Sequence, residues 1–223
     1  MKNLINKRDK HIDTPTLWSM YLSSTRFQMM VAICFISLAF SIRYITHVLA
    51  IIDMQTGTLL FDPVHQMMPT PIDLSSIIFF LTYSSVFIVI IDVIVRSPIQ
   101  VLRLGFAIAL MKLLRSFSMV LVPLEPPSGI IPLQDPLVSF MTPNNVVALR
   151  DLFFSGHCAT MMILLLVAVS PLVKKWMKMI IFVVPFLILW QRVHYTIDVV
   201  AGLAVGAAVY WLVMKVVKVD LSE

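Results

Sequence analysis

Charged residues are scarce in this chain. Only 13% of its 223 residues are Asp, Glu, Lys or Arg, whereas 59% are hydrophobic, and the mean hydropathy is +0.93. A soluble domain has about 25% charged and about 45–50% apolar residues. The composition therefore excludes an ordinary soluble protein, and the high apolar content also excludes a disordered chain. It indicates a polytopic membrane protein.

Cysteine is also scarce, with two residues in the whole chain, which excludes a disulfide-stabilised scaffold. No Cys/His cluster has the spacing of metal ligands, and no segment indicates a nucleotide site, so we expect neither a metal nor another cofactor. The sequence pI is about 9.4. Because Lys and Arg lie in short flanks between apolar runs rather than on one face, we expect no nucleic-acid partner.

Six apolar segments are long enough to be membrane spans, since a helix needs about 20 mostly apolar residues to cross about 30 Å of hydrocarbon. They are Phe27–Ile51, Leu74–Val95, Ile99–Pro123, Phe153–Leu172, Trp176–Val193 and Asp198–Val217. We therefore expect an all-α integral membrane protein with a six-helix bundle. Residues 1–26 would form an N-terminal tail and residues 27–219 the membrane domain.

The distribution of Lys and Arg predicts how the chain is oriented. With six spans, the N-terminal tail, the turns at 96–103 and 174–178 and the C-terminal end carry the basic residues and fall on one side. The opposite loops are acidic and almost free of Lys and Arg. We therefore expect both termini in the cytoplasm.

Two of the opposite loops are long, roughly Ile52–Asp73 and Leu124–Leu152. The second is apolar and rich in proline, which predicts a stiff, irregular segment on the membrane surface (Pro126, Pro127, Pro132, Pro136 and Pro143). It is either an ordinary interfacial loop or a cap over a site that lipids reach. His65 in the first loop and His47 in the first span belong to no motif, and we expect both to be structural or incidental.

Ionisable side chains inside spans are costly and usually face a protein or water-filled interior. Lys112 and Arg115 lie three residues apart in the third expected span, so they share one helical face. His157 lies near the start of the fourth expected span, and His194 and Asp198 lie at the start of the sixth. In the expected orientation Arg115, the two histidines and Asp198 lie towards the outer side. Their convergence indicates a site for an anion.

His194-Tyr-Thr-Ile-Asp198 places a carboxylate four residues beyond a histidine. On a helix, this spacing lets Asp198 accept the Nδ1 proton of His194 and leaves Nε2 free as a base or nucleophile. In Asp151-Leu-Phe-Phe-Ser-Gly-His157, Ser155 and Gly156 precede an expected helix start. Exposed backbone N–H groups at such a start attract phosphate oxygens.

These residues form a plausible site for phosphoryl transfer. His194 would attack phosphorus to give a phospho-histidine, Asp198 would orient it, and His157 would protonate the departing alkoxide. Arg115 and Lys112 would balance charge on the phosphoryl oxygens. Because the reaction is split in two, either water or a lipid hydroxyl can accept the phosphoryl group in the second step.

The chain resembles the sphingomyelin synthase branch of the type 2 phosphatidic acid phosphatase superfamily. The segment 151–157 resembles Gly-Asp-x-x-Phe-Ser-Gly-His-Thr, and 194–199 matches His-Tyr-Thr-x-Asp-Val. Leu114–Met119 resembles Leu-Arg-x-x-Thr-Met, and Pro69–Asp73 is a weaker similarity. The resemblance spans roughly Pro69–Val217, the expected catalytic core at about 69–217.

The resemblance implies histidine-dependent transfer of a phospho-headgroup between lipids, with a catalytic triad of His157, His194 and Asp198. Residues of the motifs and of the third span would bind the substrate or its phosphate; they are Arg115, Lys112, Ser155, Gly156, Asp151 and Tyr195.

The chain also departs from the family pattern. Cys158 replaces a Thr, and Leu149 and Arg150 replace a Cys-Gly pair. Lys112 is not followed by the Arg-Pro pair of the wider phosphatase pattern, and Ile188 stands where that pattern has an Arg. A phosphate monoester, close to a dianion, needs more cationic partners than a diester. The missing cations therefore favour a phospholipid diester, although Arg43, Arg150 or Arg192 could substitute.

The leading hypothesis is a membrane lipid phosphotransferase at the outer leaflet, with a phospholipid donor and a ceramide or diacylglycerol acceptor. A close alternative is a lipid phosphatase or phospholipase C-like hydrolase with the same triad. A third is a non-catalytic anion transporter, scramblase or assembly factor. The site would face the periplasm, a lumen or the outside, and the short chain favours a bacterial inner membrane. Nothing in the sequence indicates an oligomeric state.

Overall fold

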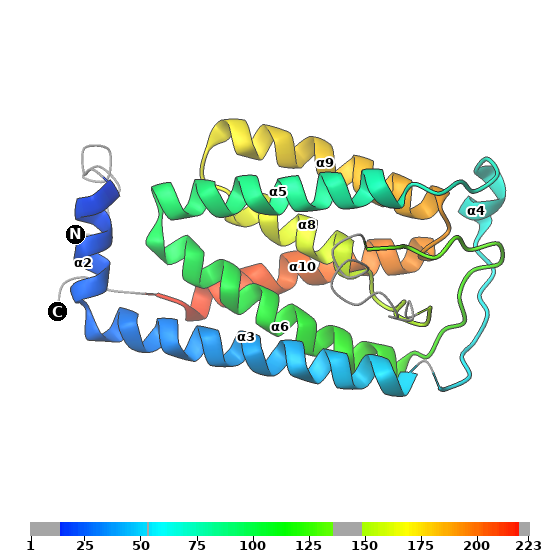
Figure 1. Cartoon of the computed structure of the whole chain (residues 1–223), viewed down its shortest axis with the longest axis horizontal. Helices are drawn as coiled ribbons and strands as arrows, with labels where there is room; N and C mark the ends of the chain where they lie inside the picture. The colour runs from blue at the N-terminus through cyan, green and yellow to red at the C-terminus, as the bar shows by residue number, and fades with distance from the viewer. Residues whose placement is uncertain (1–13, 53, 136–148, 219–223) are drawn as a thin grey trace.

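The computed structural model describes residues 14–52, 54–135 and 149–218 (Figure 1). This part of the chain is helical and contains no strand, apart from an isolated bridge between Thr58 and Leu124. Residues 1–13 of the expected N-terminal tail lie outside the described residues. So does the part of the second long loop that holds Pro136 and Pro143.

Eight helices are described. They are α2 (Thr14–Ser23), α3 (Thr25–Ile52), α4 (Pro63–Met67), α5 (Ser75–Arg96), α6 (Pro98–Leu121), α8 (Gly156–Val167), α9 (Pro171–Trp190) and α10 (Thr196–Val216). Residues 14–23 of the expected tail thus form a helix. The Trp18 indole donates to the carbonyl of Ile94 at 2.8 Å, which holds α2 against the end of α5.

Four of these helices, α3, α5, α6 and α10, are long and apolar enough to cross a membrane. An integral membrane protein is therefore supported. The helix α9 has 20 residues but carries three lysines near its start, and α8 has 12 residues. Twelve residues extend about 18 Å, which is less than the about 30 Å of a hydrocarbon core. Six spans and cytoplasmic termini stay predictions.

The short helix α8 lies at the centre of the bundle. It contacts α5, α6, α9 and α10, and most of its residues are buried. The helix α3, in contrast, packs mainly against α6 and lies along one edge of the bundle (Figure 1). Because α8 is enclosed by protein, its apolar side chains form the core rather than a surface towards lipid.

Two glycines let α10 approach α8 closely. A Cβ atom on Gly202 would lie 2.5 Å from the carbonyl oxygen of Ser155, and one on Gly206 would lie 2.5 Å from that of Ala159. Small residues four apart allow two helix backbones to touch in this way. The contact brings the start of α8, which carries His157, against the N-terminal half of α10, which carries Asp198 in its first turn.

Candidate active site

His194 and Asp198 are buried beside each other. Their exposed fractions are 2% and 0%, and Nδ1 of His194 lies 3.5 Å from Oδ2 of Asp198. The spacing suggested that His194 lies on a helix. It does not, because α10 begins only at Thr196. The Tyr195 backbone N–H donates to Oδ2 of Asp198 at 2.9 Å, so the carboxylate caps the helix and faces back towards the histidine. The pair therefore arises from a turn followed by a helix start.

This pair has unused hydrogen-bonding capacity. Nδ1 of His194 and Oδ1 of Asp198 are buried and have no hydrogen-bond partner among the described residues. Buried polar atoms usually have one, and such exceptions require an explanation. Catalytic hydrogen bonds are often long in the absence of substrate and shorten in the complex. The separation of 3.5 Å is therefore compatible with a catalytic histidine–carboxylate pair.

The helix start expected at Ser155-Gly156 is present. Ser155 is the N-cap of α8, and its side chain accepts from the Cys158 backbone N–H at 3.5 Å. The Ser155 N–H donates to the backbone carbonyl of Asp198 at 3.0 Å. This bond joins the two histidine motifs directly, so that His157 and the His194–Asp198 pair lie in one region.

Arg115 of α6 holds the segment that precedes α8. Its Nε donates to the carbonyl of Phe154 at 2.9 Å, and its guanidinium pairs with the Asp151 carboxylate at 2.7 Å and with the Asp151 carbonyl at 3.2 Å. A Cβ atom on Gly156 would lie 2.7 Å from this guanidinium. Gly156 thus leaves space for the Arg115 guanidinium, and Arg115 in turn fixes the backbone segment that precedes His157.

A pocket of about 200 Å³ opens beside His157. Residues from α3, α5, α6 and α8 and from the loop before the undescribed segment line it. Its polar lining consists of Thr82, Tyr83, Lys112, Arg115, Asp135, His157 and Thr160. The predicted cations Lys112 and Arg115 and the predicted acid His157 therefore share one cavity, and its size and lining suit a phosphate group with part of its substituents.

Other predicted binding residues lie outside this lining. Ser155 is buried and engaged as a cap, and Asp151 is paired with Arg115. The Tyr195 hydroxyl donates to the Glu125 carbonyl at 2.9 Å and accepts from the Leu60 N–H at 3.2 Å. These three residues support the site and, like His194 and Asp198, are not among the residues that line the pocket.

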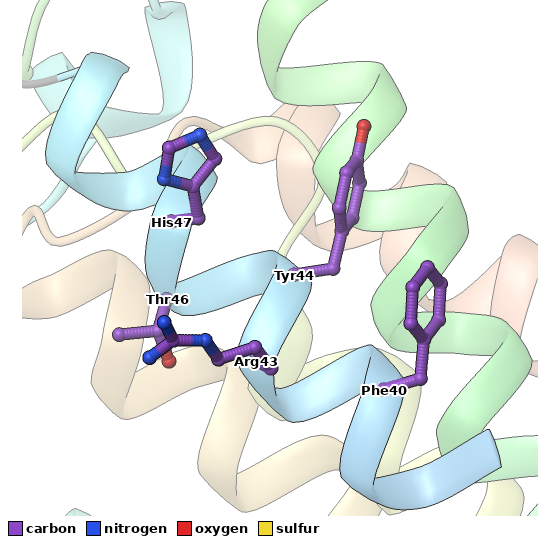
Figure 2. Close-up of a pocket in the computed structure, with 5 residues that line it drawn as sticks. All are labelled: Phe40, Arg43, Tyr44, Thr46 and His47. Atoms are coloured by element: carbon purple, nitrogen blue, oxygen red, sulfur yellow. The ribbon is translucent and has the colours of Figure 1, made fainter. Parts of the chain in front are cut away.

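The three cations considered as substitutes also lie elsewhere. Arg150 pairs with Glu125 at 3.0 Å, and Arg192 donates to the carbonyls of Ser128 and His65. Arg43 is exposed on α3, where it lines a separate hollow of about 310 Å³ with Phe40, Tyr44, Thr46 and His47 (Figure 2). None of the three lines the pocket beside His157.

Sequence reasoning missed Thr82 and Tyr83 of α5. Thr82 lines the pocket, and its hydroxyl is buried and has no hydrogen-bond partner within the part of the chain that the structure describes. Tyr83 donates to Asp135 at 2.7 Å. Hydroxyl groups in apolar helices usually bond to a carbonyl of the previous turn, so their presence in the sequence did not indicate a site.

Residues 150–215 match the family model described as PAP2 superfamily C-terminal. The matched stretch contains both histidine motifs and reaches from the approach to α8 almost to the end of α10. It supports the type 2 phosphatidic acid phosphatase superfamily and, at this level, an enzyme of the lipid phosphatase or phosphotransferase kind. No curated protein and no solved structure matches the chain.

Proposed function

We propose that the protein is an integral-membrane lipid phosphotransferase of the sphingomyelin synthase-like branch. It would move a phospho-headgroup from a phospholipid to a lipid alcohol, ceramide or diacylglycerol. The observation that carries the proposal is the buried His194–Asp198 pair, joined by the Ser155–Asp198 hydrogen bond to the helix start that bears His157. A binding protein has no need of an unsatisfied buried histidine–carboxylate pair at this position.

The reaction has two steps. In the first, Nε2 of His194 attacks phosphorus, the bond to the glyceride oxygen breaks, and His157 gives its proton to that oxygen. Asp198 holds the Nδ1 proton and stabilises the charge that develops on the imidazole. In the second, His157 takes the proton of the acceptor hydroxyl, whose oxygen attacks phosphorus as the phosphorus–nitrogen bond breaks. His157 and His194 then have their original protonation states.

The cations at the pocket favour a diester donor. Lys112 and Arg115 line the pocket, and Arg115 is already paired with Asp151. The remaining positive charge suits the single negative charge of a phosphodiester better than the near-dianion of a monoester. Arg43, Arg150 and Arg192, which could have supplied more charge, lie outside the lining.

The proposed site faces the outer leaflet. The first turns of α8 and α10 lie at the same end of the bundle as the acidic loops, opposite the lysines at the start of α9. With both termini in the cytoplasm, α9 would be a fifth span and α8 a short, protein-enclosed crossing. In a bacterium the site would then face the periplasm from the inner membrane.

Hydrolysis is the second candidate, favoured by the polar wall of the pocket. Tyr83, Asp135 and the unpartnered Thr82 hydroxyl could hold water near His157. Water would then replace the lipid alcohol in the second step, as in a lipid phosphatase or a phospholipase C-like hydrolase.

The test uses purified protein in mixed micelles with headgroup-labelled phospholipids and diacylglycerol or ceramide. His194→Ala and His157→Gln are run beside His47→Ala, a control on the exposed face of α3. Label in a new lipid, lost in the first two variants and kept in the third, supports the transferase. Label released into water under the same pattern identifies the hydrolase. Failure of both products across a broad lipid panel, including monoesters, overturns the proposal in favour of anion binding without turnover.

A further inference from the structure

The turn that carries His194 is held from outside by the segment between α3 and α5. Oδ2 of Asp62 accepts the Thr196 backbone N–H at 2.6 Å, and Oδ1 accepts the Thr196 hydroxyl at 3.0 Å. Nε2 of His65 lies 3.0 Å from the backbone carbonyl oxygen of His194. Asp62 and His65 therefore contact the residues on either side of Tyr195, and both are nearly buried.

The ring of His65 also stacks on the ring of Tyr195. Their centroids are 6.1 Å apart, with 25° between the planes. A carbonyl oxygen only accepts hydrogen bonds. Nε2 of His65 must therefore carry a proton and donate a hydrogen bond to the backbone carbonyl oxygen of His194. In addition, a guanidinium nitrogen of Arg192 donates to the backbone carbonyl of His65 at 3.3 Å. The segment between α3 and α5 and the turn that carries His194 thus each donate a hydrogen bond to the other.

We propose that Asp62 and His65 are positioning residues, which fix the His194 turn so that its imidazole stays aligned with Asp198. The inference rests on the proposed function and concerns two residues that belong to neither histidine motif. Neither lines the pocket, so they act through the backbone of His194 and Thr196 rather than on the substrate.

The location of His194 makes such support necessary. It precedes the first helical residue of α10, so helical hydrogen bonds do not fix its backbone. The backbone carbonyl of His194 is instead fixed by His65, and the N–H of the first helical residue, Thr196, is satisfied by Asp62. If either contact is lost, the turn can shift, and a shift of about 1 Å at a catalytic group can cost about 10²-fold in rate.

The charge of Asp62 fits this role. Burial raises the pKa of this carboxyl, but hydrogen bonds from Thr196 and Val64 and the nearby His65 ring outweigh it, so the pKa lies below its ordinary value. Asp62 is therefore a carboxylate at neutral pH. A negative charge at the start of α10 is favourable because the N-terminus of a helix carries partial positive charge.

The experiment compares three replacements in the labelled-lipid assay. His65→Phe keeps a ring to stack on Tyr195 and removes the donor, whereas His65→Gln keeps an N–H donor. Asp62→Ala removes the contact with Thr196. We expect His65→Phe and Asp62→Ala to lower kcat about 10- to 100-fold, with KM for the donor lipid within about threefold, and His65→Gln to recover most of kcat.

His47→Phe serves as the control for loss of an unrelated histidine, since His47 is exposed on α3. Rates are expressed per folded protein, from gel filtration and thermal unfolding in detergent. If His65→Phe lowers only the folded fraction, or if His65→Gln recovers nothing, the role is structural and the inference is wrong. A wild-type kcat in His65→Phe would also overturn the inference, but it would leave the proposed function intact.

A second readout needs no turnover. In protein with ¹⁵N-labelled histidine, the ring resonances of His194 are assigned by their loss in His194→Gln. We expect them to move in His65→Phe and to return towards the wild-type position in His65→Gln. If the wild-type protein has no transfer or hydrolase activity, the proposed function fails. Even then, the ring resonances of His194 test whether His65 aligns His194. Unchanged resonances in His65→Phe would overturn this inference.

Discussion

Asp92 and Asp198 are buried carboxylates at opposite ends of the bundle, and they differ in their hydrogen-bond partners. Both oxygens of Asp92 are used: they accept the N–H groups of Val169 and Ser170 at 2.7–3.2 Å and pair with Arg96 at 2.9 Å. Asp198 accepts one backbone N–H and lies 3.5 Å from His194, and its Oδ1 has no partner in the described ranges.

The difference suits a structural use of Asp92 and the proposed catalytic use of Asp198. Asp92 satisfies the turn between α8 and α9, which ends the short central helix, and nothing remains for a ligand. Asp198 is under-satisfied in a region that also contains a second buried polar atom without a partner, Nδ1 of His194. Unsatisfied buried groups cost stability, so their concentration at one end of the described bundle favours the proposal that this end holds the active site.

The largest expected effect is on Asp198. Asp198→Asn should lower kcat about 10⁴-fold, because an amide cannot hold the His194 ring in the required tautomer or stabilise its positive charge. The fold should persist, since the amide oxygen can still accept the Tyr195 N–H. Transfer assays and thermal unfolding of the purified variant check both parts. Activity above one tenth of wild type would show that the carboxylate is only a helix cap.

Arg115 tests whether the approach to His157 requires a fixed guanidinium. Arg115→Lys keeps the charge but loses the planar fork that contacts Phe154 and Asp151 together, so we expect about a 10²-fold loss of kcat/KM. Arg43→Lys on the exposed face of α3 should be neutral in the same assay. Equal losses in the two variants would contradict a local role for Arg115.

Asp92 should show the reverse pattern. Asp92→Ala removes the acceptor of two backbone N–H groups, and the free energy of unfolding should fall by about 1.5–3 kcal/mol. Activity per folded molecule should stay within about twofold of wild type. Denaturation in detergent and the transfer assay measure the two quantities. A catalytic defect larger than the stability defect would remove the distinction between the two carboxylates.

The smallest expected effect is on Thr82. Thr82→Val has nearly the same shape and removes a buried hydroxyl that bonds to none of the described residues, so stability should be unchanged or rise by up to about 1 kcal/mol. If the hydroxyl binds substrate, KM for the donor should rise about threefold, since one neutral hydrogen bond contributes about 1 kcal/mol. Thr46→Val, on the exposed face of α3, provides the comparison. An unchanged KM would show that the Thr82 hydroxyl does not bind the donor.

Much of the helical pattern could be predicted from the sequence, because long apolar runs are a strong signal. The expected segments at Leu74–Val95 and Ile99–Pro123 correspond to α5 and α6 within two residues at each end. The expected segment Phe153–Leu172 was too long, since hydropathy continues through the turn at Ala168–Ser170. That turn depends on Asp92, which lies 77 residues away from Val169 in the chain.

The candidate site was predictable where its residues lie in short motifs. The cap at Ser155 and the proximity of His194 to Asp198 are both present. The residues that surround these motifs were not predictable, because each acts across a large sequence separation. His65 carried no local signal, and its partner is a main-chain carbonyl 129 residues further along.

The place of His157 beside α5 also gives the proposed site a depth in the bilayer. The ring of Phe79, which meets that of His157 edge-on, belongs to a residue four positions after the start of α5, so the proposed acid lies about one turn from that end of the helix. With this end of α5 at the outer leaflet, as proposed, His157 would lie near the level at which a phospholipid's glycerol joins its phosphate. A donor lipid would then reach the site from within its leaflet, with its acyl chains still packed among those of the neighbouring lipids during transfer of the headgroup.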